Sequence, residues 1–77
     1  MSKFKLFDIV VLRRDLPEEG LRAGDTGAIV ELFEGQGAIV EFLDEAGDTT
    51  AVTDVHLADI RKAESADLGA ARTTAEP

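Results

Sequence analysis

Gly27-Ala28-Ile29-Val30-Glu31 is repeated ten residues later as Gly37-Ala38-Ile39-Val40-Glu41. Two copies are too few for a solenoid, which needs at least ~3 repeats. The repeat therefore indicates the two strands of one β-hairpin. Because side chains alternate between the faces of a strand, each copy places its alanine and valine on one face, which we expect to face the core. Its isoleucine and glutamate then lie on the opposite face.

The loop between the two copies determines how their strands pair. A two-residue loop at Gly35-Gln36 would place Val30 opposite Glu41 and set a carboxylate against the core. A three-residue loop with Gly37 in the left-handed conformation avoids this, because Val30 then lies opposite Phe42. We therefore expect the three-residue loop, or a β-bulge that restores the same facing.

Further segments rich in β-branched residues predict three more strands. The five expected strands are Asp8–Arg14, Thr26–Glu34, Gly37–Asp44, Thr49–Val55 and Asp59–Arg61. Two leucines in the loop of residues 15–25 are expected to cap one end of the core. Five short antiparallel strands after a long early loop are typical of a small SH3-like barrel, whose closure removes the edges of an open sheet. We expect this all-β domain over residues 1–62, with the OB-fold as the alternative.

Residues 63–77 differ from the rest of the chain because they contain one large apolar residue, Leu68. Burial of a single leucine cannot offset the entropy lost on ordering the whole segment. We expect a disordered or weakly helical tail.

The composition excludes several classes of function. Sixteen acidic residues against eight basic ones give 77 residues a formal charge of −8, which disfavours phosphate backbones and anionic membranes as partners. The absence of cysteine excludes disulfides, thiolate chemistry and zinc fingers. No apolar run approaches the ~18 residues of a membrane span, and no signal peptide pattern is present. We expect a small cytoplasmic protein.

Residues that could carry catalysis are few. His56 is the only histidine, and with Asp54 and Asp59 it forms the only candidate metal site, a combination that is common by chance. Ser2 and Ser65 lie near the chain ends, where they cannot form a nucleophilic triad, and no glycine-rich phosphate loop occurs. We expect no enzymatic activity, no metal and no cofactor.

A second apolar face, opposite the expected core of the hairpin, is the most informative feature for function. Its residues are Ile29, Phe33, Ile39 and Leu43, with Glu31 and Glu41 at the rim. Such a face must be covered by the N-terminal residues 4–7, by the loop at 16–21, by a second copy or by a partner. We expect an unknown protein partner, and the acidic rim favours a basic one. We further expect a monomer or weak homodimer, with an antitoxin-like role as a specific form of this function.

The alternative function is nucleic-acid binding through a basic patch. Arg13 and Arg14 would lie near Arg61 and Lys62 if the first and last strands are neighbours. The chain has no Trp or Tyr for base stacking, which such proteins use alongside a basic groove. Pairing of these basic residues with nearby acids is the simpler interpretation.

Residues 7–12, 15–21 and 24–31 resemble a family of small bacterial proteins, domain of unknown function 4926. The most specific part is Leu16-Pro17-Glu18-Glu19-Gly20-Leu21 followed by Gly24-Asp25-Thr26-Gly27. The resemblance covers about residues 4–62 and implies an SH3-like barrel, a paired or antitoxin-like role, and no catalytic residues. Residues 24–31 also resemble the KOW motif of ribosomal and transcription factors, which implies the nucleic-acid alternative.

Overall fold

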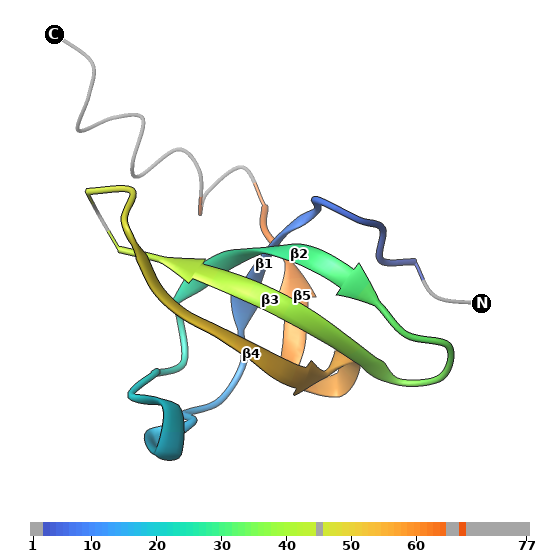
Figure 1. The fold of residues 1–77 in the computed structure, drawn as a ribbon, viewed down its shortest axis with the longest axis horizontal. Coiled ribbons are helices and arrows are strands. Elements are labelled where there is room, and N and C mark those ends of the chain that lie inside the picture. Colours follow the sequence, from blue (N-terminus) through green and yellow to red (C-terminus); the bar gives the residue numbers. More distant parts are fainter. Residues whose placement is uncertain (1–2, 45, 65–66, 68–77) are drawn as a thin grey trace, which may run out of the picture.

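The computed structural model describes residues 3–44, 46–64 and 67, and contains five strands (Figure 1). The strands are β1 (Ile9–Leu12), β2 (Thr26–Leu32), β3 (Gly37–Leu43), β4 (Thr49–His56) and β5 (Ile60–Lys62). Two short 3-10 turns, η1 (Pro17–Glu19) and η2 (Leu57–Asp59), lie after β1 and after β4. The expected strands are therefore confirmed to within a few residues. The expected tail, residues 63–77, lies outside the described residues except for 63, 64 and 67.

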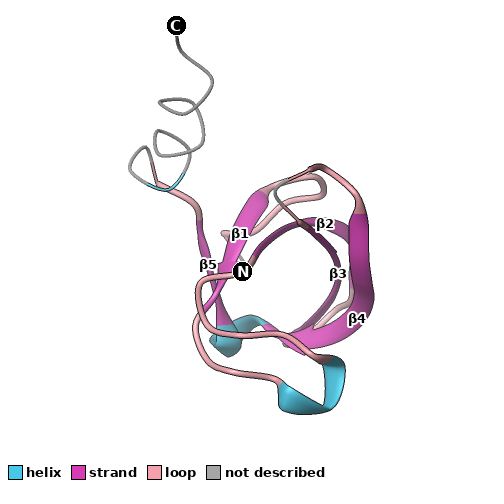
Figure 2. Cartoon of the chain, turned by 90° about the vertical axis from the view of Figure 1, so that its left-hand side faces the viewer, coloured by secondary structure: helices cyan, strands magenta, loops and turns pink. Residues whose placement is uncertain are grey.

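The five strands form one antiparallel sheet in the order β4-β3-β2-β1-β5. This confirms the all-β class, and it makes the first and last strands neighbours, which was the condition for bringing the four basic residues together. The sheet curls so that the strands follow one another around a ring, with η2 between β4 and β5 (Figure 2). In the described part of the chain no ladder joins β4 to β5, so hydrogen bonds do not close the barrel. None of the described helical segments is long and apolar enough to cross a membrane.

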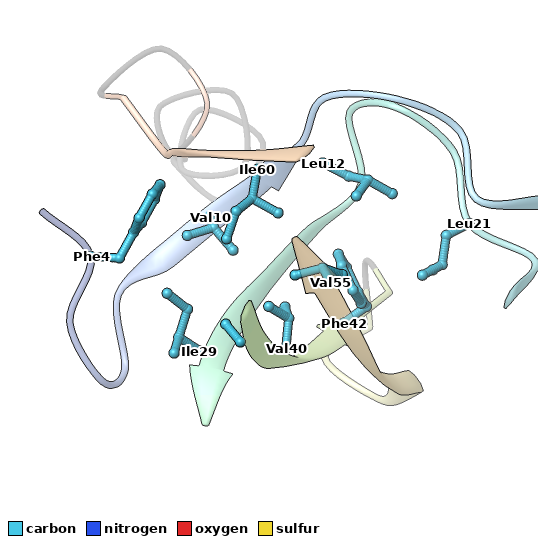
Figure 3. Close-up of a cluster of buried hydrophobic side chains, with 10 residues drawn as sticks. Phe4, Val10, Leu12, Leu21, Ile29, Val40, Phe42, Val55 and Ile60 are labelled. Carbon is cyan, nitrogen blue, oxygen red and sulfur yellow. The ribbon is translucent and has the colours of Figure 1, made fainter. Parts of the chain in front are cut away.

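The core fills the inside of this curled sheet (Figure 3). Its members come from every strand, from the N-terminal segment and from the loop between β1 and β2. They are Phe4, Val10, Leu12, Leu21, Ile29, Ala38, Val40, Phe42, Val55 and Ile60. Leu21 closes one end with Leu16 packed against the cluster, and the two leucines are joined by an isolated bridge. The prediction that this loop caps the core is confirmed.

The pairing of β2 with β3 differs from the prediction. Gly27 lies opposite Phe42 and Ile29 opposite Val40, and the register then shifts across Val30. This β-bulge reverses which side chains face inward, as bulges do when they re-aim a strand. Ile29 is consequently buried in the core with 0% of its surface exposed. Its predicted place on the outer face was wrong, because a strict alternation from Val30 ignores the extra residue.

Beyond the bulge the expected facing returns. Glu31 lies opposite Ile39 on the outer side, and Leu32 lies opposite Ala38 toward the core. The loop is longer than the predicted three residues, since the strands end at Leu32 and begin again at Gly37. Gly35, with φ 102°, takes the left-handed conformation that was predicted for Gly37. A bulge is therefore present, but it lies in β2 and not in the loop, and it changes the facing of Ile29 instead of preserving the predicted pairing of Val30 with Phe42.

Candidate protein-binding surface

The four basic residues of the nucleic-acid alternative are brought together by the pairing of β1 with β5. Arg61 lies opposite Val11 and Lys62 opposite Val10, and Arg13 and Arg14 follow the end of β1 directly. The structure thus confirms that the first and last strands place these residues near one another. Each of them, however, has a local partner.

These local partners are mostly carboxylates. Arg14 Nε lies 3.1 Å from Asp59 Oδ1, and Lys62 Nζ lies 3.6 Å from Asp8 Oδ2. The Arg13 guanidinium donates to the backbone oxygen of Ala58 at 3.3 Å. Ion pairs with the protein's own acids reduce the positive potential that a phosphate backbone would meet. The arrangement favours stabilisation of the β1–β5 edge over nucleic-acid binding.

Arg61 makes the most specific of these interactions, a bidentate pair of hydrogen bonds to the Asp67 carboxylate. Its Nη1 and Nη2 donate to the two carboxylate oxygens at 2.9 and 3.1 Å, and the Glu64 N–H donates to the same carboxylate at 2.7 Å. The bond from Arg61, followed by that from the backbone, lowers the pKa of Asp67 to about 2. The same hydrogen bond raises the pKa of Arg61. The pair therefore stays ionised at neutral pH.

The outer face of the sheet carries a row of side chains in register across four strands. Ile9 lies opposite Ala28, Ala28 opposite Glu41, and Glu41 opposite Val52. Ile9 and Val52 expose 42% and 58% of their surface. The Thr49 hydroxyl donates to the Glu41 carboxylate and orients it within this row. The row mixes exposed apolar groups with a positioned acid.

Five of the six residues predicted for a partner-binding face do lie on this outer side. Phe33 and Leu43 are exposed by 47% and 39%, and Glu31 is exposed as well. Ile39 and Glu41 are half-buried among their neighbours in the sheet. The sixth, Ile29, belongs to the core as described above. We therefore define the outer face as Ile9, Glu31, Phe33, Ile39, Glu41, Leu43 and Val52.

Ile9 and Val52 were not assigned to this face because they come from strands outside the repeated hairpin. Only the register across β1 and β4 shows that they extend its outer face. Ile9 precedes the buried Val10, and Val52 lies between the half-buried Ala51 and Thr53, so alternation was a usable signal for the side on which they lie. That signal does not show which strands lie beside the hairpin, because this depends on the topology of the whole sheet.

Neither of the chain's own candidate covers reaches the outer face. Phe4 is buried in the core cluster, and the loop leucine Leu21 closes the end of the core. Leu6 and Phe7 form the tip of a turn in which the Asp8 N–H donates to the Lys5 oxygen at 3.1 Å, and both remain exposed. The exposed apolar side chains of the outer face are thus covered by neither of these two segments.

A shallow hollow of about 260 Å³ lies beside Phe33, where the start of β3 pairs with the end of β4. Phe33, Asp54 and His56 line it together with Gly37, Ala38 and Val55. Its volume is below the ~300–1,000 Å³ of typical small-molecule pockets. His56 and Asp54 thus share this hollow, whereas Asp59 pairs with Arg14. The described residues contain no group of three potential metal ligands.

Charge is segregated between the two parts of the sheet. Residues 23–60, which include β2, β3 and β4, hold nine carboxylates and no lysine or arginine, a formal charge of −9. The rest of the chain holds seven carboxylates and all eight basic residues, a formal charge of +1. Within the described part of 23–60, Asp59 alone forms an ion pair. This segregation can be counted in the sequence and was missed there.

A curled five-stranded antiparallel sheet with an acidic, partly apolar outer face defines a small all-β domain. The chain belongs to the family described as domain of unknown function (DUF4926), whose model matches residues 6–62. The resemblance of the loop and glycine motifs to that family is thereby confirmed. No curated protein and no solved structure matches the chain.

Proposed function

We propose that this domain is a non-enzymatic protein-binding module that recognises a basic protein through its outer face. One observation carries the proposal: exposed apolar side chains lie on the acidic part of the sheet, and neither the N-terminal segment nor the loop covers them. Apolar groups supply the buried area of an interface, and unpaired carboxylates speed encounter with a basic partner. An accessory or antitoxin-like partner of a small basic protein is the specific form of this function.

A matched pair of double variants tests the proposal. Phe33→Ser with Leu43→Ser removes one phenylalanine and one leucine from the outer face. Phe7→Ser with Leu6→Ser removes the same two side chains from the N-terminal turn, where they are at least as exposed (72% and 49% against 47% and 39%). The two variants therefore lose the same pair of side chains from different places, and the turn variant loses at least as much exposed apolar surface.

The measurement is capture from a nuclease-treated lysate of the source organism, read by mass spectrometry with the wild-type chain alongside. We expect a stoichiometric basic protein to be retained by the wild type and the turn variant and lost by the outer-face variant. Circular dichroism must show that both variants keep their β structure. Equal capture by both variants would contradict the proposal, as would a captured protein that is acidic.

A further inference from the structure

The two edges of the sheet differ in how they are protected. The β5 edge is three residues long and carries Arg61 and Lys62, and a short charged edge resists pairing with other strands. The β4 edge is eight residues long, contains no proline, and carries Asp54 as its one formally charged side chain. A long edge with so few charges presents unpaired backbone groups on which a further strand can form.

The ladder shows which backbone groups β4 presents. The Leu57 N–H donates to the Gln36 oxygen at 2.7 Å, one residue beyond the paired His56 and Gly37. Because hydrogen-bonded and non-hydrogen-bonded pairs alternate in an antiparallel ladder, the N–H groups of Val52, Asp54 and His56 point away from β3. No backbone group of the described residues outside the ladder accepts from them. These three N–H groups form a free row along the edge.

The hollow lies at the end of this free edge. Phe33 and His56 provide its aromatic wall, and Asp54 provides a carboxylate that has no ion pair within the described part of the chain. A lysine or arginine side chain suits both features, since its stem packs on apolar surface and its charge meets the ring face and the carboxylate.

We propose that the free edge of β4 binds an extended segment of the partner, with lysine or arginine at alternate positions, by β-strand addition. This inference rests on the proposed function, from which it takes the basic partner, and it adds the mode of recognition. Main-chain hydrogen bonds provide affinity in this mode, and pockets for alternate side chains provide specificity. A second copy of the chain is the less favourable occupant, because pairing of two β4 edges would bring together two sectors that each carry −9.

The probe is an acetylated, amidated peptide of eight residues with lysine and valine in alternation, added to the full-length ¹⁵N-labelled protein. We expect the amide signals of Val52, Asp54 and His56 to shift and their hydrogen exchange to slow. The control peptide has the same side chains with its central amides N-methylated, which preserves charge but removes main-chain donors. We expect it to bind at least ~10-fold more weakly, because several hydrogen bonds are lost.

A pair of variants tests the same edge from the side of the protein. His56 has φ −77°, a value that proline adopts, so His56→Pro removes one outward N–H while keeping the backbone shape. His56→Ala removes the imidazole and keeps the N–H. We expect His56→Pro to bind the peptide about 2–10-fold more weakly than His56→Ala.

Three outcomes of the peptide experiment would overturn the inference: no binding of the alternating peptide, equal binding of the N-methylated peptide, or shifts confined to residues away from β4. In the variant experiment, equal affinity of His56→Pro and His56→Ala would overturn it. The proposed function is judged separately by the capture experiment. Loss of capture in the Phe33 and Leu43 double variant, combined with an unresponsive β4 edge, would leave the proposed function standing without strand addition.

Discussion

Gly27 and Gly37, which begin the two copies of the repeat, are predicted to change the stability of the fold in opposite directions when each is replaced by alanine. A Cβ atom at Gly27 would lie 2.5 Å from the Glu41 oxygen and 2.7 Å from Val40 Cγ1, where real Cβ atoms keep at least 3.0 Å. The neighbouring strand must therefore move by about half an ångström (3.0 − 2.5 Å) at the first contact. Overpacking of this kind destabilises the fold by about 1–3 kcal/mol. Replacing glycine by alanine also reduces the conformational freedom of the unfolded chain, which stabilises the fold by about 0.4–1 kcal/mol.

We expect Gly27→Ala to lower the free energy of unfolding by about 1–2 kcal/mol. This is a sizeable part of the total free energy of unfolding, which is on the order of 4–12 kcal/mol for a chain of this length. In thermal unfolding it corresponds to a fall in Tm of about 4–16 °C. Urea titration followed by circular dichroism gives the free energy independently, provided that the m-value is unchanged.

Gly37→Ala is the matched control. A Cβ there would lie 3.6 Å from Phe33 Cδ2 and 3.9 Å from the Val55 oxygen, which are ordinary contacts, and Gly37 does not have a positive φ. We expect this variant to be unchanged or more stable by about 0.4–1 kcal/mol. If Gly27→Ala proved as stable as Gly37→Ala, the close approach of β3 to Gly27, and with it the pairing of Gly27 with Phe42, would be refuted.

Two further predictions concern the bulge and the ion pair. Ile29→Ala should lower the free energy of unfolding by about 2–5 kcal/mol, because the Ile29 side chain is fully buried. Ile39 is half-buried, so Ile39→Ala should cost clearly less in the same urea titration. The reverse order would show that β2 alternates without a bulge. The pKa of Asp67 is lowered below 3.8 to about 2, so the stabilisation from its pair with Arg61 is present above about pH 3.8 and lost as pH falls through about 2. A carboxyl titration by NMR should show this midpoint, and Arg61→Gln should raise it; an unchanged midpoint would contradict the pairing.

Strand positions could be predicted from the sequence because local signals agreed with the fold. Ile and Val cluster in the strands, whereas Gly, Pro and Asp mark the connections. The pairing of β1 with β5 followed from topology, since these strands complete the expected barrel. That pairing fulfils the condition under which the four basic residues were predicted to meet.

The facing of β2 could not be predicted because alternation and packing conflict within it. Alternation places Ile29 and Glu31 on the same face, and because the equivalent Ile39 and Glu41 of the second copy do share the outer face, the repeat gives no sign that β2 departs from alternation. The bulge at Val30 resolves the conflict by burying Ile29 and exposing Glu31. Gly27 permits this solution, since the absence of a side chain allows β3 to approach while Phe42 fills the core opposite it.

The segregation of charge separates what stabilises the fold from what is available for binding. The three ion pairs of the described residues lie on or beside the β1–β5 side, at Asp8, Asp59 and Asp67. The carboxylates of β2, β3 and β4 have no basic neighbour on their own strands and repel one another, which destabilises the compact state. The basic partner proposed above would remove this repulsion on binding. Added salt would then act in opposite directions, since screening relieves the repulsion in the free protein and weakens attraction to the proposed partner.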